Sequence, residues 1–211
     1  MVQTAAEALA LVGLPDVSRE TLDRLAAFVA LLEKWQGRTN LVAASTLGDV
    51  WRRHVADSAQ LVSLFPEAQN WLDLGSGAGF PGLVIAIIRA ERRGHVDLVE
   101  SDGRKAAFLR QAIFTTSVPA TVHQERVEAL TSTWKTPADI VTARALAPLA
   151  RLLEYTAPVV AHGVRAAFPK GREYQREIDE ASKSWDFDLV KHKSKVEDDA
   201  VILEITRLEA K

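Results

Sequence analysis

The sequence contains no cysteine among its 211 residues, and its longest unbroken apolar run covers only Leu25–Leu32. The missing thiols exclude disulfides, zinc ribbons, iron–sulfur clusters and cysteine nucleophiles together. The short apolar runs exclude a membrane span, and the lack of any basic residue before Arg19 argues against a signal peptide. We therefore expect a cytoplasmic protein with no metal site.

An excess of charge of one sign is also missing, because 26 basic residues face 28 acidic ones, for a formal net charge of −2. This balance excludes a uniformly basic nucleic-acid binder but leaves room for a local basic face. Apolar residues make up 47% of the chain, which excludes disordered and collagen-like proteins. The length fits one large globular domain with an appendage.

The first third of the chain has helical periodicity. Ser18 is a candidate N-cap, and the apolar residues after it, from Leu22 to Leu32, follow the spacing of an amphipathic helix that ends near Gly37. A second helical pattern runs from Leu47 to Val62 and stops before Pro66. We expect residues 1–66 to form a helical extension packed on a domain made by residues 67–211.

After Trp71, short apolar runs alternate with helical stretches, which is typical of repeated βαβ units. The predicted strands are Trp71–Leu74, Val96–Glu100, Ala120–His123, Asp139–Ala143, Val164–Phe168, Phe187–His192 and Val201–Arg207. The predicted helices are Pro81–Arg89, Arg104–Thr115, Val127–Leu130, Leu149–Val160 and Glu173–Lys183. A short turn through Glu197, Asp198 and Asp199 makes the last two strands antiparallel. This α/β pattern resembles the Rossmann-like class I methyltransferases, with a seven-stranded, mostly parallel sheet, a C-terminal antiparallel hairpin and an N-terminal helical extension.

A glycine-rich segment, Gly75-Ser76-Gly77-Ala78-Gly79-Phe80-Pro81-Gly82, lies between the first predicted strand and the helix that follows. Glycines at such a turn let a ligand approach the backbone closely. The spacing Gly77-x-Gly79-x-x-Gly82 also matches the dinucleotide fingerprint, so an NAD(P)-dependent oxidoreductase remains an alternative.

Neighbouring residues favour S-adenosylmethionine as the ligand of this loop. Asp73 can reach a methionine ammonium group, whereas its negative charge would be unhelpful beside a pyrophosphate. Pro81 removes an N–H that a phosphate would need. Glu100 ends the next strand, at the usual distance for an acid that binds ribose hydroxyls. Val127 follows the third strand, where an apolar side chain flanks the adenine.

A series of short motifs runs from residue 40 to residue 171: Asn40-Leu41, Arg53-His54-x-x-Asp57-Ser58, Gly75-x-Gly77-x-Gly79-x-Pro81-Gly82, Glu100-Ser101-x-x-Arg104-Lys105-x-x-Phe108-Leu109, Arg126-Val127-Glu128, Thr142-Ala143-Arg144-Ala145 and Lys170-Gly171. In this order they resemble one family, the bacterial 16S ribosomal RNA guanine-N7 methyltransferase G family, also called the glucose-inhibited division protein B family.

The resemblance implies methyl transfer from S-adenosylmethionine to N7 of guanine 527 in the 530 loop of 16S rRNA, with the rRNA or the small ribosomal subunit as partner. The resemblance places the family's cofactor contacts on Gly75, Phe80, Val127, Glu128 and Arg144, and the general pattern of the fold adds Glu100. The sequence departs from the family in three places. Ala78 replaces a frequent proline and Phe80 a frequent leucine, and Asp198-Asp199 precede the last strand, where many members carry an arginine.

Guanine N7 has an exposed lone pair and no proton, so positioning and electrostatics suffice and no general base is expected. Three residues are candidates for the catalytic centre. His54 and Asp57 lie three apart and can form a hydrogen-bonded pair beside the base, or only pack a helix. Arg144 can turn toward the methionine carboxylate or an RNA phosphate, or form a structural salt bridge.

An RNA substrate needs basic residues that contact its phosphates. The candidates at strand ends and on adjacent helices are Arg52, Arg53, Arg104, Lys105, Arg110, Lys170 and Arg172. We expect a monomer. Besides the oxidoreductase, a non-catalytic ribosome-assembly factor that binds RNA on the same fold remains an alternative.

Overall fold

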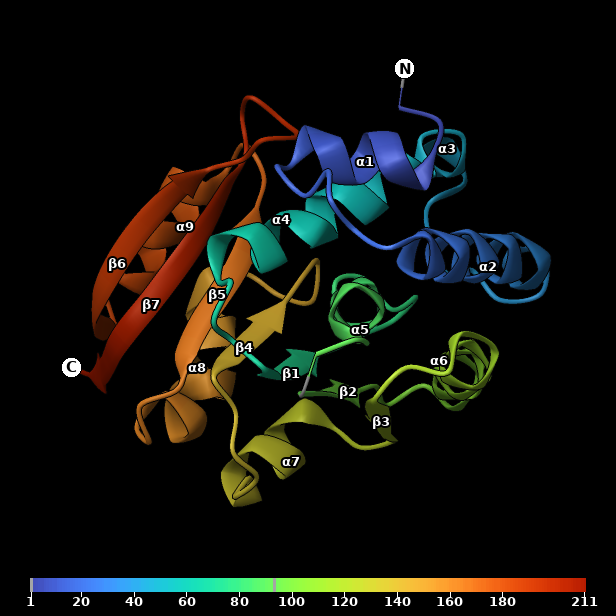
Figure 1. Cartoon of the computed structure of the whole chain (residues 1–211). Helices are drawn as coiled ribbons and strands as arrows, with labels where there is room; N and C mark the ends of the chain where they lie inside the picture. Colours follow the sequence, from blue (N-terminus) through green and yellow to red (C-terminus); the bar gives the residue numbers. More distant parts are fainter. Residues whose placement is uncertain (1, 93) are drawn as a thin grey trace.

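The computed structural model describes residues 2–92 and 94–211 and contains a seven-stranded sheet in the order β3-β2-β1-β4-β5-β7-β6 (Figure 1). The strands are β1 (Asn70–Leu74), β2 (His95–Val99), β3 (Ala120–His123), β4 (Ile140–Ala143), β5 (Arg165–Lys170), β6 (Trp185–Lys193) and β7 (Val201–Ala210). The first five strands are parallel, whereas β7 runs antiparallel to both β5 and β6. The predicted sheet with its C-terminal hairpin is therefore confirmed.

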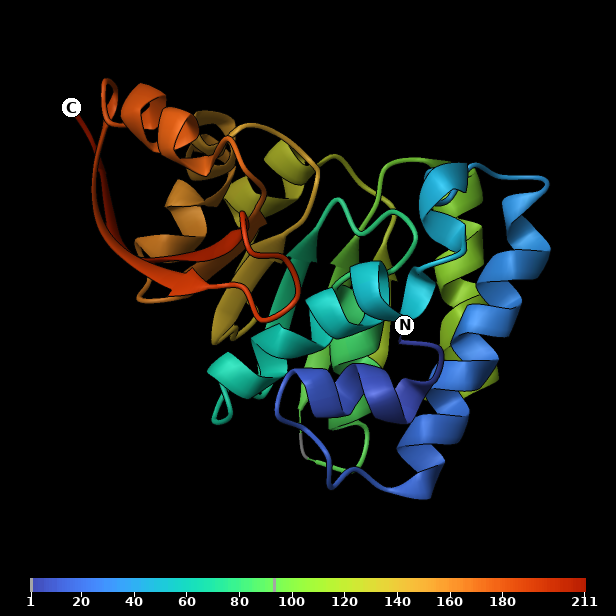
Figure 2. The same ribbon diagram turned by 90° about the horizontal axis from the view of Figure 1, so that it is seen from above.

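Helices cover both faces of the parallel part of the sheet (Figures 1 and 2), which is why central strands such as β1 and β4 are almost continuously buried. Helices α4, α5 and α6 share one hydrophobic core with the N-terminal helices, and α7, α8 and α9 share a second core on the opposite face. The helices are α1 (Ala5–Leu11), α2 (Arg19–Gln36), α3 (Ala44–Leu47), α4 (Asp57–Leu64), α5 (Gly82–Arg89), α6 (Gly103–Thr116), α7 (Val127–Thr133), α8 (Leu149–Val160) and α9 (Tyr174–Ala181).

Helix α2 begins as the sequence predicts, with the Ser18 hydroxyl accepting from the Thr21 N–H. Its apolar face packs on α5 and α6 (Figure 2). Phe28 is fully buried, with its ring centroid 5.3 Å from that of Phe80 and 6.3 Å from that of Phe108. The helical segment thus shares a core with the sheet, while a domain boundary at residue 66 stays a prediction.

The prediction of one continuous helix from Leu47 to Val62 is wrong. The chain instead forms the short helix α3, a turn, a π-helix η1 (Trp51–Ala56) and then α4. π-Helices are rare and occur frequently at functional sites. Helix α1 was not predicted. No helix in the described part of the chain is long and apolar enough to cross a membrane.

Candidate functional site

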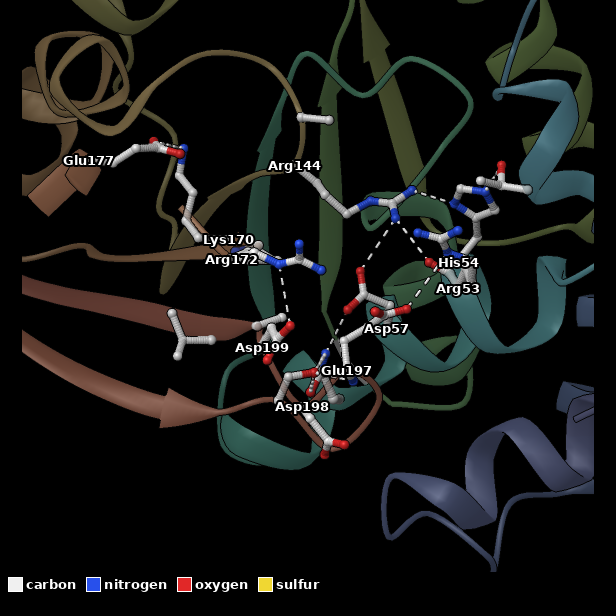
Figure 3. A pocket seen from close by; sticks show the side chains of 18 of the residues that line it. Arg53, His54, Asp57, Arg144, Lys170, Arg172, Glu177, Glu197, Asp198 and Asp199 are labelled. Carbon is white, nitrogen blue, oxygen red and sulfur yellow. Dashed lines mark hydrogen bonds and ion pairs between the residues drawn. The ribbon is translucent and has the colours of Figure 1, made fainter. Parts of the chain in front are cut away.

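A cavity of about 850 Å³ opens at the carboxyl ends of β4 and β5 (Figure 3). Its walls come mainly from four parts of the chain: the π-helix η1 with the start of α4, the loop after β4, the end of β5 with the start of α9, and the loop that joins β6 to β7. In open α/β sheets, ligands bind outside the carboxyl ends of the strands. This cavity is therefore the candidate substrate pocket.

Arg144 crosses this pocket from the end of β4 to η1 (Figure 3). One terminal nitrogen, Nη2, lies 3.0 Å from His54 Nδ1, and the other, Nη1, lies 3.4 Å from Asp57 Oδ2 and donates to the Arg53 carbonyl at 3.2 Å. The Arg144 and Asp57 side chains are only 18% and 17% exposed. Three partners in this enclosed place hold the guanidinium in one orientation.

His54 is a neutral imidazole with both ring nitrogens engaged. Nε2 lies 2.8 Å from the Thr46 hydroxyl, and Nδ1 accepts from Arg144, so the proton belongs on Nε2. Burial, followed by the charges of the neighbouring Arg144 and Arg53, lowers the pKa of His54 from 6.5 to about 4. The side chain therefore orients Arg144 as an acceptor at neutral pH.

The predicted hydrogen-bonded pair of His54 and Asp57 is replaced by a bridge through Arg144. The prediction assumed α-helical spacing, but His54 lies in the π-helix, whose wider turns rotate successive side chains differently. Asp57 turns to Arg144 and to Gln60, whose amide donates at 2.8 Å. Burial raises the pKa of Asp57 against the opposing effect of Arg144.

Phe80 packs against His54 and Arg144 of this network. Its ring is stacked on His54 with centroids 5.0 Å apart, and the Arg144 guanidinium carbon lies 5.3 Å from the ring centre. The side chain is only 4% exposed. Any contact of Phe80 with a cofactor would therefore come from its backbone, while the ring fixes His54 and Arg144.

Lys170 lies on the opposite wall and is bound internally. Its ammonium lies 2.7 Å from Glu177 Oε2 and 2.9 Å from the Ala147 carbonyl, and its side chain is 9% exposed. The same Glu177 oxygen accepts from the Leu149 N–H at 2.7 Å. Lys170 was predicted to contact RNA phosphates, but burial and these bonds make it a clamp on the loop after β4.

That loop, Arg144–Pro148, connects the pocket to the glycine-rich turn after β1. Gly75 has a φ of +65°, and a Cβ placed on it would lie 2.6 Å from the Leu146 side chain. Only glycine allows this conformation and this close approach together. The predicted cofactor turn and the pocket therefore adjoin through Leu146.

Asp73 contacts the end of the same turn through the Gly82 N–H. The residue is fully buried; its Oδ2 accepts from the Gly82 N–H at 3.2 Å, and its Oδ1 has no hydrogen-bond partner among the described residues. Burial raises the pKa of Asp73 to about 7. A Cβ on Gly82 would lie 2.6 Å from Asp73 Oδ2, so this glycine is needed for close packing of α5 on β1.

Glu100 spans from the end of β2 to the glycine turn. It accepts from the Gly77 N–H at 2.9 Å and from the Asp102 N–H at 2.7 Å. A Cβ on Gly77, with φ +52°, would make only an ordinary contact with the Gly75 carbonyl at 3.7 Å, whereas one on Gly79 would lie 2.6 Å from the Leu83 side chain. The turn and Glu100 therefore form one backbone-lined edge; that this edge binds a cofactor stays a prediction.

The remaining predicted cofactor residues lie at the start of α7. Val127 is 8% exposed in the core under α7 and α8, and the half-exposed Glu128 lies 3.7 Å from Arg151. Neither residue lines the pocket of Figure 3.

The predicted RNA contacts fall into two groups. Arg52, Arg53, Lys170 and Arg172 line the pocket, whereas Arg104, Lys105 and Arg110 lie on α6 and do not. The Arg104 and Lys105 N–H groups are capped by Asp102, and Arg110 donates to Gln124. The structure does not join the two groups into one cluster.

Sequence reasoning missed several pocket residues. Thr46, Glu177 and Glu197 line the pocket but belong to no motif noted above. Glu197 acts through Arg53, which is far away in the sequence, whereas Thr46 and Glu177 contact His54 and Lys170, eight and seven positions away. A polar residue eight positions before a candidate histidine is too common a pattern to single out Thr46.

Comparison with known proteins agrees with this architecture. A family model described as rRNA small subunit methyltransferase G matches residues 21–204. The "Ribosomal RNA small subunit methyltransferase G" of Brucella canis is 54% identical over 198 residues, which cover 93% of this chain and 92% of that protein. The protein of the same name from Brucella suis biovar 1 matches to the same extent.

Solved structures share the fold at low sequence identity. Cofactor-bound Rv0187 from MTB has a TM-score of 0.62 at 14% identity and covers 98% of this chain and 99% of its own. The SAH-bound methyltransferase PaMTH1 of Podospora anserina has a TM-score of 0.59 at 12% identity, covering 90% and 97%. The fold is thus that of the class I methyltransferases, and the chain belongs to the rRNA small subunit methyltransferase G family.

Proposed function

We propose that this protein transfers the methyl group of S-adenosylmethionine to N7 of guanine 527 in 16S rRNA, and that its partner is the small ribosomal subunit or its rRNA. The observation that carries the proposal is the closed network at the pocket, in which Arg144 is fixed by His54 and Asp57. Such a network can position a base but offers no free proton acceptor at its histidine.

The residues around the glycine turn fit the cofactor. Asp73 Oδ1 is buried without a partner among the described residues, and an ammonium group nearby would complement it. Glu100 holds the turn through Gly77 while each of its oxygens keeps a further lone pair for ribose hydroxyls. S-adenosylmethionine supplies an electrophilic sulfonium methyl group when it is bound there.

Among the described residues of the network, His54 is not available as a base, which fits alkylation of an aromatic nitrogen. His54 donates through Nε2 and accepts through Nδ1, and burial keeps its pKa near 4. It therefore cannot remove a substrate proton without breaking the network. Guanine N7 bears a lone pair and no proton, so its methylation requires no such step.

Orientation of the base would then fall to Arg144 and its neighbours. A guanidinium held in an enclosed site is a strong donor for guanine O6, which lies beside N7 on the same edge of the base. Arg53 and Arg172 at the pocket rim supply positive charge for the flanking phosphates.

The test is to incubate the protein with labelled S-adenosylmethionine and small subunits that lack the modification, and to map the label. We expect label on N7 of guanine 527. Label elsewhere or none overturns the assignment, and preferential binding of NADH would instead support the oxidoreductase. Specific subunit binding without any turnover would support the assembly factor.

The role of the network is tested by His54→Ala. We expect slower methyl transfer or weaker RNA binding, because Arg144 loses one of its three partners. An unchanged methylation rate together with unchanged RNA affinity would remove His54 from the site.

A further inference from the structure

The loop between β6 and β7 brings acidic side chains to the rim of the pocket (Figure 3). Glu197 lies 3.7 Å from Arg53 and 4.0 Å from Arg52, and Asp199 lies 3.3 Å from Arg172. Two of these arginines, Arg53 and Arg172, are the residues that the proposed function uses for RNA phosphates. In the structure each of them already has a carboxylate as its partner.

The charges of the pocket separate into an inner and an outer set. Inside, Arg144 pairs with Asp57 and Lys170 pairs with Glu177. Outside, the rim contains Arg52, Arg53 and Arg172 against Glu197, Asp198 and Asp199. Both sets have equal numbers of positive and negative groups, so the pocket presents almost no net charge to a distant polyanion.

The outer pairs are built to exchange partners. Arg53 and Glu197 are 47% and 42% exposed, and Arg172 and Asp199 are 80% and 68% exposed. Ion pairs in such exposed places contribute little to stability. An incoming phosphate can therefore replace either carboxylate by side-chain rotation.

The backbone of the loop is anchored, in contrast to these side chains. Ser194 is buried, and its hydroxyl accepts from the N–H groups of Val196 and Glu197 at 3.1 and 3.2 Å. The Lys195 ammonium donates to the Val12 carbonyl at 2.8 Å. The two carboxylates consequently stay near the rim whether or not the arginines are occupied.

We propose that Glu197 and Asp199 determine RNA selectivity by occupying the rim arginines in place of phosphate. This inference rests on the proposed RNA substrate. An RNA that contributes only phosphates must displace the carboxylates and gains little. An RNA that also inserts a base beside Arg144 gains contacts that outweigh the exchange. The carboxylates thus weaken nonspecific binding more than productive binding.

The experiment compares Glu197→Gln/Asp199→Asn with a control of equal charge change, Asp186→Asn/Glu209→Gln. The control carboxylates pair with Arg207 at the far end of the same hairpin, at 3.1 and 3.5 Å. The probes are a labelled poly(U) 12-mer and small subunits lacking the modification, titrated from 50 to 200 mM KCl at about equal fractions folded by circular dichroism.

We expect the rim variant to bind poly(U) on the order of tenfold more tightly than the wild type, with a steeper salt dependence. Binding to small subunits should tighten by less than about threefold, and the control should change poly(U) affinity by less than about twofold. Adding Arg53→Gln and Arg172→Gln to the rim variant should abolish the gain.

A rim variant that matches the control on poly(U) overturns the proposal, as does an equal gain on poly(U) and on small subunits. A gain that survives loss of both arginines also overturns it. If the wild-type protein fails to methylate small subunits, the proposed function fails, while the poly(U) comparison still decides whether the carboxylates shield the arginines.

Discussion

The pair of Lys170 and Glu177 gives the sharpest test of how burial sets the strength of an ion pair in this protein. Lys170 Nζ lies 2.7 Å from Glu177 Oε2, and the two side chains are 9% and 26% exposed. Lys170→Met leaves the carboxylate partly buried beside the Leu149 N–H alone. Breaking a fully buried pair costs about 3–5 kcal/mol, so with Glu177 a quarter exposed we expect a loss of about 2–3 kcal/mol.

The matched control lies at the C-terminal end of α9. Lys183 Nζ lies 2.5 Å from Glu180 Oε2, but both side chains are 68% exposed. Lys183→Met should therefore cost less than about 1 kcal/mol. Urea unfolding of each single and double variant, with Glu177→Gln and Glu180→Gln, gives the coupling free energy of each pair.

We expect a coupling of about 1–3 kcal/mol for the Lys170 pair and less than about 0.5 kcal/mol for the Lys183 pair. Equal couplings would refute the reasoning, because the two pairs share their chemistry and differ in exposure. Lys170→Met should also slow methyl transfer, since Lys170 holds the Ala147 carbonyl of the loop whose Leu146 covers Gly75.

Three further predictions concern the glycine turn and the network. Gly75→Val should abolish cofactor binding in calorimetry while the chain still folds, at a cost of about 1–3 kcal/mol for the positive φ and about 1–3 kcal/mol more for displacing Leu146; unaltered affinity would refute the assigned turn. Gly82→Ala should lower the free energy of unfolding by about 1–3 kcal/mol, because its Cβ meets Leu98 and Asp73, and a loss below about 0.5 kcal/mol would contradict the packing argument. The pKa of His54 is lowered from 6.5 to about 4 in the folded protein, so on acidification the unfolded chain takes up the proton first. The free energy of unfolding should therefore fall by on the order of 3 kcal/mol as the pH drops from 6.5 to about 4. His54→Gln should remove this part of the pH dependence in urea titrations, and an unchanged slope would contradict it.

The sheet could be predicted because its sequence signals are local. Strands buried on both faces appear as short apolar runs, and the glycine turn marks where β1 gives way to α5. The short interval between β6 and β7 leaves an antiparallel pair as the simplest connection. The observed ends of β6 and β7 differ from the predicted ones by a few residues, because hydrogen bonding to the neighbouring strands decides where each strand ends.

The π-helix could not be predicted from the same signals. The apolar positions Val50, Val55 and Leu61 suit a continuous helix, and a π turn changes the hydrogen-bond register without changing composition. In the π-helix, His54 stacks on Phe80 and is hydrogen-bonded to Arg144. Both of these partners come from later elements of the chain. Tertiary contacts therefore select the conformation that local propensity leaves open.

The site divides in the same way. Arg52, Arg53, Arg144 and Lys170 were candidates because they occur in motifs or at strand ends, and the structure brings them to one pocket. Their partners were not predictable, because Glu197 reaches Arg53 only through the fold of the hairpin. Lys170 shows the consequence: a basic residue at a strand end is a phosphate contact or a clamp depending on a carboxylate elsewhere.

The net charge of −2 therefore matters less than which ion pairs are buried. Arg144–Asp57 and Lys170–Glu177 lie inside the pocket, where breaking them leaves a poorly solvated charge, so they fix geometry. Arg53–Glu197 and Arg172–Asp199 lie at the rim, where water and salt already compete, so they can yield to phosphate. A near-neutral protein can thus bind a polyanion if its exposed pairs open and its buried pairs do not. Added salt should weaken the outer pairs and RNA binding while leaving the Arg144 network intact.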